Sequence, residues 1–136
     1  MIGDANIMTI LVAAIAGMVV GAVWYSPKLF RGAWMKYSGV NRGDIKKANE
    51  KGMRKMYLMA FIGHIVTAYV LSYFIGHPGM ASIGAAVGLW AWLGFVAPVH
   101  LGMVLWEGKP MQYFWINTLH ALVTLLVMGM VIAAWS

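Results

Sequence analysis

Four long apolar stretches constrain this chain more than any other feature of its sequence. They span residues 7–25, 53–75, 81–106 and 111–135. A helix of about 20 residues crosses a hydrocarbon core of about 30 Å, and backbone groups in lipid must be hydrogen-bonded within the protein. The sequence therefore predicts an all-α integral membrane fold in which four transmembrane helices form one bundle. The expected helices of this single domain lie at about 6–26, 53–76, 81–106 and 111–135.

The composition agrees with a membrane protein rather than a soluble domain. Hydrophobic residues make up 62% of the 136 residues and charged residues only 10%, too few to cover the surface of a small soluble globule. There is no Cys, which excludes disulfides and thiolate metal sites. The first apolar stretch has no basic residue before it and is longer than the core of a signal peptide, so we expect it to be the first transmembrane helix.

The basic residues are concentrated in one segment. Nine of the ten lie in 28–55, between the first and second apolar stretches, and the tenth is Lys109. Because loops rich in Lys and Arg face the cytoplasm, we predict that segment 28–55 is cytoplasmic and that both termini face outward. Basic segments beside membrane helices attract anionic headgroups, so the net charge of +6 predicts membrane lipids as partners rather than nucleic acid.

The sequence WYSPKLFRGAW, residues 24–34, ends the first apolar stretch. Proline removes a backbone donor and disfavours helix at the preceding residue, so we expect the helix to end here. Aromatic residues are enriched at the headgroup level of membranes. We predict a membrane-interface and lipid anchor made of Trp24, Tyr25, Pro27, Lys28, Arg31 and Trp34. The alternative is a binding site for a lipid headgroup or a partner, with an aromatic rim beside the basic residues.

The rest of the basic segment is predicted to be partly helical. Apolar and aromatic residues recur at helical spacing over 29–37, which is typical of an amphipathic helix in the membrane interface. A solvated connector with aromatic anchors is the alternative. A second short helix is expected after Asn41, which can cap its first turn, with Asp44 near its positive end.

Two pairs of glycines are spaced four residues apart in the apolar stretches. Gly17 and Gly21 lie in the first, and Gly84 and Gly88 in the third. Small residues at this spacing allow two membrane helices to approach closely. We predict that both pairs are helix-packing positions, within the chain or between copies, and we expect a homo-oligomer.

Polar side chains within the apolar stretches are the strongest candidates for a functional site, because they usually face the bundle interior. His64, His100, Glu107, Asn117 and His120 are all predicted to lie in the half of the bundle nearer the basic segment. Three roles remain open for this cluster: hydrogen bonds between helices, a pathway for protons or substrate, and a metal site. No spacing among them matches a ligand signature, so we expect no metal and no cofactor.

Several segments carry a resemblance when taken together: WYSP at 24–27 with Trp34 and Met35, DIKKAN at 44–49, WAWLGFV at 90–96 and WEGKP at 106–110. In this order they resemble a family of small bacterial membrane proteins, domain of unknown function seventeen-sixty-one. The resemblance implies four helices in a bacterial inner membrane and brings no assigned reaction or substrate. The matching positions are Trp24, Tyr25, Ser26, Pro27, Trp34, Asn49, Gly94, Phe95, Glu107, Gly108, Pro110 and Asn117. The three histidines are not among them.

Three functions fit the sequence. The first is a structural or interaction bundle that binds itself, lipid or a membrane partner. The second is a small transporter or proton-coupled permease that uses the intramembrane histidines. Its weakness is that the four acidic residues all lie near or beyond the membrane interfaces. The third is an enzyme acting on a lipid-like substrate, although no nucleophile is paired with a base.

Overall fold

A computed structural model describes residues 7–26, 28–38, 43, 53–76 and 79–135 of the chain. The helices are α1 (Ile7–Trp24), α2 (Arg31–Ser38), α4 (Met53–Ile75), α5 (Ala81–Ala91), η2 (Trp92–Val96), α6 (Ala97–Leu105) and α7 (Met111–Ala134), and the described residues contain no strand. Among these described residues, four spans are long and apolar enough to cross a membrane. The protein is a multi-pass membrane protein with a four-helix bundle, as the sequence predicts.

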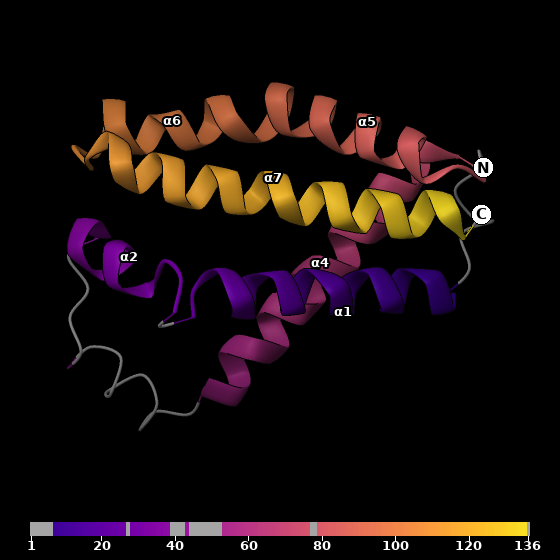
Figure 1. The fold of residues 1–136 in the computed structure, drawn as a ribbon, viewed down its shortest axis with the longest axis horizontal. Coiled ribbons are helices and arrows are strands. Elements are labelled where there is room, and N and C mark those ends of the chain that lie inside the picture. Colours follow the sequence, from indigo (N-terminus) through magenta and orange to yellow (C-terminus); the bar gives the residue numbers. More distant parts are fainter. Residues whose placement is uncertain (1–6, 27, 39–42, 44–52, 77–78, 136) are drawn as a thin grey trace.

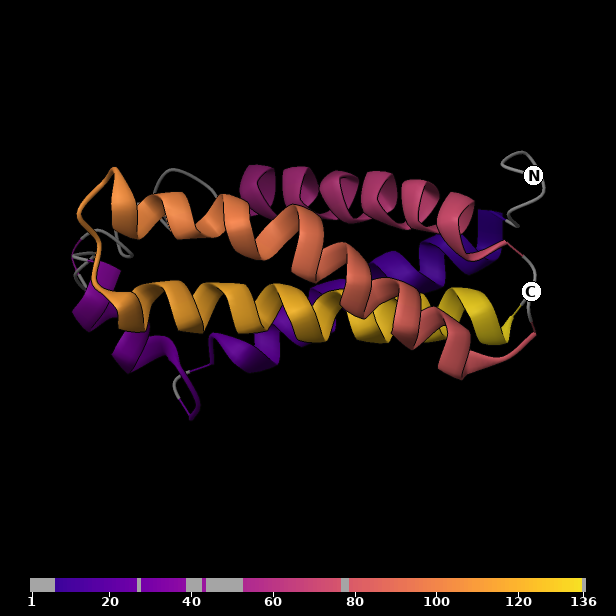
Figure 2. The ribbon, with the colours of Figure 1, turned by 90° about the horizontal axis from the view of Figure 1, so that it is seen from above.

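The bundle is built around α7. Figure 1 shows α7 between α1 on one side and the α5–α6 span on the other, with α4 crossing behind at an angle. The view turned by 90° places α4 on one side of the molecule, beside the α5–α6 span over part of its length (Figure 2). The beginning of α1 and the end of α7 lie at one end of the bundle, and α2 lies at the other. The two ends are called the terminal end and the α2 end below.

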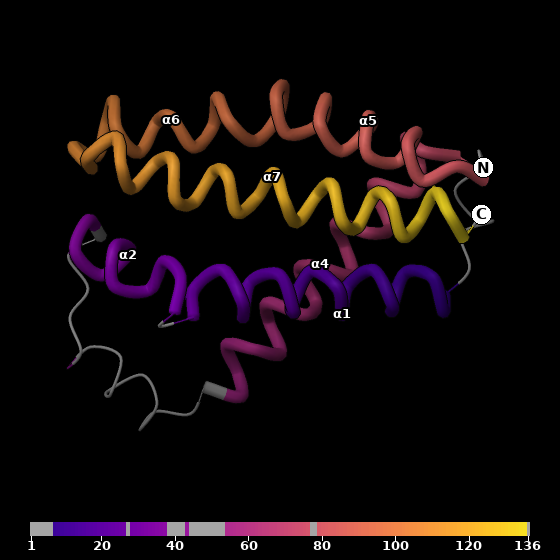
Figure 3. The backbone as a smooth tube through the Cα atoms, viewed as in Figure 1, coloured from indigo at the N-terminus to yellow at the C-terminus, as the bar shows by residue number. Residues whose placement is uncertain are grey.

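The third span differs from the uninterrupted helix predicted over 81–106. It follows one continuous path from α5 to α6 (Figure 3), but the segment Trp92–Val96 is a π-helix, in which the amide of Ala97 bonds to the carbonyl of Trp92. Pro98 supplies the reason, because a proline inside a helix lacks the N–H and its ring clashes with the carbonyl four residues earlier. The wider turn lets α6 begin with the proline in its first turn, where it is tolerated.

The turns at both ends of this span contain glycines with positive φ values. Gly76 and Gly79 precede α5, Gly108 precedes α7, and all three have positive φ values near 70°. Glycine adopts this conformation without the penalty that a side chain brings. These glycines therefore let the second, third and fourth spans fold back on one another.

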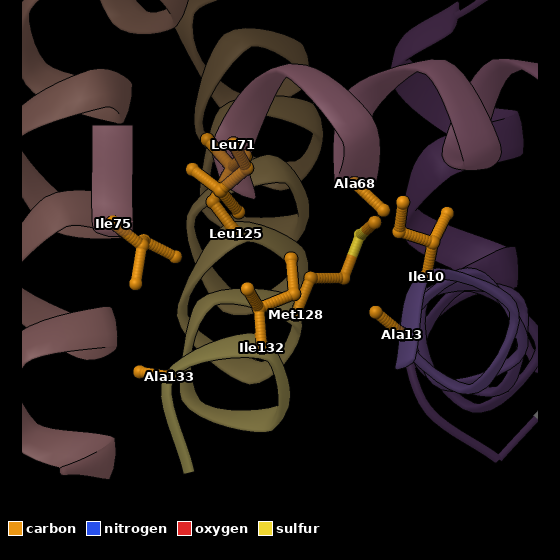
Figure 4. Packing of buried hydrophobic residues seen from close by; sticks show 9 residues of the cluster. All are labelled: Ile10, Ala13, Ala68, Leu71, Ile75, Leu125, Met128, Ile132 and Ala133. Carbon is orange, nitrogen blue, oxygen red and sulfur yellow. The ribbon is translucent and has the colours of Figure 1, made fainter. Parts of the chain in front are cut away.

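The apolar core lies toward the terminal end. Its centre is Met128 of α7, which is fully buried, and its side chain extends between α1 and α4 toward Ile10 and Ala68 (Figure 4). At the α2 end, by contrast, every described side chain from Arg54 to Ala60 on α4 is exposed. The first half of α4 therefore leaves the bundle, while its second half is packed against α1 and α7.

The two glycine pairs pack within the chain, and they do so differently. A Cβ on Gly84 would clash with the backbone carbonyl of Gly129, and one on Gly88 would lie 2.6 Å from the carbonyl oxygen of Leu125. A Cβ on Gly17 would instead lie 3.0 Å from His64 Nδ1, and one on Gly21 3.4 Å from His120 Nε2. The pair in α5 thus permits backbone contact with α7, whereas the pair in α1 leaves room for two histidine rings.

Segment α2 is the helix predicted within 29–37. It begins at Arg31 after a tight turn in which the amides of Leu29 and Arg31 bond to the carbonyl of Ser26. The predicted short helix after Asn41, and Pro27 itself, lie outside the described residues.

Candidate functional site

The turn after α1 holds Trp24 against α7. The Trp24 indole donates a hydrogen bond of 3.0 Å to the carbonyl of Ile116, and its ring stacks on Phe30 with centroids 4.6 Å apart. The Arg31 side chain folds back over the same turn, and its Nε donates to the carbonyl of Tyr25 at 3.0 Å. The turn is therefore fixed to α7 and places Arg31 beside the end of α1.

Tyr25 is hydrogen-bonded to a polar side chain of α7. Its hydroxyl donates to Asn117 Oδ1 at 2.6 Å, and Asn117 Nδ2 donates in turn to the carbonyl of Tyr113. The Tyr25 ring lies between two other rings, with centroid distances of 4.9 Å to His120 and 6.1 Å to Trp34. The motif residues that the sequence places at the membrane interface are thus also contacts between helices; their role as a membrane anchor stays a prediction.

Burial raises the pKa of Tyr25 from 10.0 to about 12, with a smaller contribution from the negative charge that Tyr113 acquires on ionisation. The neutral phenol is therefore favoured in the folded protein, and it remains a donor to Asn117. The stability linked to this group is fully present below pH 10 and is lost as the pH rises through about 12.

We expect Tyr25 to ionise near pH 12. Its titration curve is the phenolate absorbance of the native protein minus that of Tyr25→Phe at each pH. The native phenol ionises late because its charged form loses hydration when buried. Circular dichroism at each pH shows over which range both proteins stay folded. A difference curve centred at pH 10 in the folded protein would show that Tyr25 is solvated.

A cleft of about 1000 Å³ opens at the α2 end between α1, α4 and α7. Its wall is mainly apolar and includes Ile15, Met18 and Val19 of α1 and Met56 and Phe61 of α4. Its polar lining comes from seven residues: Tyr25, Arg31, Trp34, Tyr57, His64, Asn117 and His120. Sites for small ligands are concave and mostly apolar with a few polar groups, and this cleft has those properties.

Two histidines form the polar part of the cleft nearest the bundle centre. His64 of α4 lies over Gly17, and His120 of α7 lies over Gly21, one turn of α1 nearer its end. The His120 ring has a long contact of 3.4 Å to Thr124 Oγ1, whose hydroxyl donates at 2.8 Å to the His120 carbonyl. Among the described residues, the His64 ring makes no hydrogen bond. Neither imidazole is therefore fully hydrogen-bonded within the bundle.

The structure brings together part of the predicted polar cluster. His64, Asn117 and His120 line one cleft, whereas His100 is not among its described lining residues. The Nδ1 atom of His100 is buried and has no hydrogen-bond partner among the described residues. Glu107 is exposed in the turn before α7, away from the cleft lining. Within the described part of the chain, no three His, Asp or Glu side chains are placed to hold a metal ion.

Two features, one in the cleft wall and one in the packing of the third span, were not predicted from the sequence. The apolar wall from α4, including Met56 and Phe61, reads in the sequence as ordinary membrane helix. Trp92 is the other: its indole donates to the carbonyl of Thr118 at 2.7 Å and lies 3.2 Å from the Thr118 hydroxyl. The signal available in the sequence was Trp92 itself, which is followed by Gly94 and Pro98 within a long apolar run.

Comparison with known proteins identifies a family. No curated protein matches the chain, and no solved structure matches it. One family model matches residues 8–133, from the start of α1 to the end of α7, and it is described as "Protein of unknown function (DUF1761)". The match includes the turn after α1, the cleft and the π-helix. Because it covers nearly the whole chain, the protein belongs to this family of unknown function, DUF1761.

Proposed function

We propose that this protein binds a membrane lipid with an anionic headgroup in the cleft between α1, α4 and α7. The observation that carries the proposal is the combination of an apolar wall and the Arg31 guanidinium in one open cleft of about 1000 Å³. This is the lipid-binding form of the first of the three functions that fit the sequence. The expected homo-oligomer, the transporter and the lipid-acting enzyme stay predictions.

The length of the cleft suits one membrane leaflet. Its lining extends along α1 from Ile15 to Tyr25, which corresponds to about 15 Å at the helical rise. Half of a hydrocarbon core of about 30 Å has the same depth. An acyl chain from the adjacent leaflet can therefore lie along the wall, because the first half of α4 stands away from the bundle.

Charge favours an anionic ligand. Arg31 has one hydrogen bond to a described residue, from Nε, so its terminal nitrogens are available to donate two hydrogen bonds to a phosphate. None of the described residues that line the cleft is acidic. Lys28 and Lys36 are exposed near the same turn and add positive charge at this end. An uncharged or cationic headgroup would gain less from this environment.

We place this end of the bundle at the cytoplasmic face of a bacterial inner membrane. Helix α2, the beginning of α4 and the turn before α7 all carry basic residues, and they lie in the half of the molecule at the α2 end (Figure 1). Basic segments beside membrane helices usually face the cytoplasm. The bound lipid would then come from the inner leaflet, where anionic headgroups are attracted to such segments.

The test is a competition between phosphatidylglycerol and phosphatidylcholine for the detergent-solubilised protein, with bound lipid measured by native mass spectrometry. The native protein is expected to prefer phosphatidylglycerol. Arg31→Gln is expected to lose roughly tenfold to hundredfold in affinity for it, because a charge-assisted hydrogen bond contributes about 1.5–3 kcal/mol.

Lys36→Gln is the matched control, since Lys36 lies on the same helix, is exposed and does not line the cleft. Its expected affinity is close to that of the native protein. Equal binding of the two lipids by the native protein, or equal losses in the two variants, would contradict a headgroup site at Arg31.

A further inference from the structure

We infer that His120 binds an ester carbonyl oxygen of a diacyl phospholipid whose phosphate lies at Arg31. The inference rests on the proposed function and names the class of lipid that the same cleft takes. It starts from the His120 imidazole, which lines the cleft but is not fully hydrogen-bonded within the protein.

The His120 ring lacks a good hydrogen-bond partner within the protein. Polar groups within the hydrocarbon zone cost free energy unless they are hydrogen-bonded, because no water is present to replace the missing bond. The Nε2 atom of His120 has only the 3.4 Å contact to Thr124, and that hydroxyl already donates to the His120 carbonyl. A neutral imidazole has one N–H to donate, and a carbonyl oxygen is a matching acceptor.

A second observation is the space beside the rings. Gly17 and Gly21 have no side chain, and a Cβ at either position would lie 3.0 Å from His64 Nδ1 or 3.4 Å from His120 Nε2. The imidazoles consequently lie directly against the α1 backbone at the edge of the cleft. Bulkier residues on α1 would cover the ring nitrogens and close the cleft to a ligand's polar atoms.

A third observation is the order of the polar groups with depth. Arg31 contacts the carbonyl of Tyr25, and the Tyr25 hydroxyl contacts Asn117. His120 is three residues further along α7, so it lies about 4.5 Å deeper, and His64 faces the next turn of α1. In a diacyl phospholipid the ester carbonyls follow the phosphate after only a few bonds, and the hydrocarbon chains follow them. The cleft presents its partners in the same order.

A lipid with a headgroup but no ester carbonyls lacks the acceptor for His120. The sharpest probe is therefore dioleoyl phosphatidylglycerol compared with its dioleyl ether analogue, which has the same headgroup and chain length and no carbonyl. Each lipid is titrated into the detergent-solubilised protein, and the bound fraction is measured by native mass spectrometry.

The native protein is expected to bind the ester lipid roughly threefold to thirtyfold more tightly, the range that one hydrogen bond in a membrane protein provides. His120→Phe, which keeps a ring of similar shape, is expected to bind the ester lipid as weakly as the ether lipid. His120→Gln restores a hydrogen-bonding group and is expected to recover part of the preference.

His100→Phe is the control, because His100 does not line the cleft, and it is expected to keep the full preference. Equal binding of the two lipids by the native protein, with Arg31→Gln still weakening both, would overturn this inference and leave the proposed function intact. Failure of the native protein to bind either lipid better than phosphatidylcholine would overturn both. The comparison in the native protein needs no variant to fold.

Discussion

Gly84→Ala is expected to destabilise the bundle by about 3 kcal/mol or more, at or above the upper end of the usual range for overpacking. The added methyl group would overlap the backbone carbonyl of Gly129 and would lie 2.7 Å from the Ala133 side chain. A backbone carbonyl in a helix cannot rotate away, so α5 and α7 would have to separate. Their contact would be lost over Gly88 as well, where the backbones also touch.

Two other glycines provide graded controls in the same measurement, thermal unfolding in detergent followed by circular dichroism. Gly63 faces open space, so Gly63→Ala is expected to leave the unfolding temperature nearly unchanged. Gly17→Ala is expected to fall between the two, because its methyl group meets the ends of the His64 and Met128 side chains, which can move. Equal unfolding temperatures for Gly84→Ala and Gly63→Ala would show that α5 and α7 are not in backbone contact.

These glycines also show what the sequence could and could not reveal about packing. The two GxxxG pairs look alike in the sequence, and in the structure another part of the chain lies close to each of them. Whether that part is a backbone or a side chain depends on the partner helix. The partner Gly129 was missed, although its spacing to Ala133 is itself a pair of small residues four apart.

The four spans were predictable because each is long, apolar and bounded by Gly, Pro or charged residues. The π-helix was not, because hydrophobicity does not register a change of hydrogen-bonding pattern inside an apolar run. Pro98 was the visible cause, yet a proline in a membrane helix is compatible with a kink, a break or a wider turn. Which of these three forms occurs depends on how the span packs against α7, for example through the contact of Trp92 with Thr118.

The candidate site was partly predictable. His64, Asn117 and His120 were all expected in the half of the bundle nearer the basic segment, and in the structure they line one cleft. The contacts of Trp24 and Tyr25 with α7 join residues 92 positions apart, and no local pattern reports such a pairing. The cleft itself arises because α4 leaves the bundle, which depends on the packing angle between helices rather than on composition.

The second large effect on stability is expected at Trp92, the first residue of the π-helix. Trp92→Ala is expected to destabilise the protein by about 3 kcal/mol, the lower end of the range for Trp-to-Ala changes in packed positions. The change removes both the ring that packs against the core cluster and the donor that reaches the carbonyl of Thr118. Trp24 makes the equivalent bond from α1 to Ile116, so the two indoles hold α7 from two different helices.

Trp90→Ala is the matched control, since Trp90 lies two residues earlier on the same span and is 68% exposed. Its expected loss is small in the same detergent unfolding assay, because its ring contacts lipid or detergent rather than α7. Trp92→Phe separates the two contributions: it keeps a ring and removes the donor, and about 0.6–2 kcal/mol is expected for one interhelical hydrogen bond in a membrane. Equal losses for Trp90→Ala and Trp92→Ala would mean that Trp92 does not stabilise the protein through its contact with α7.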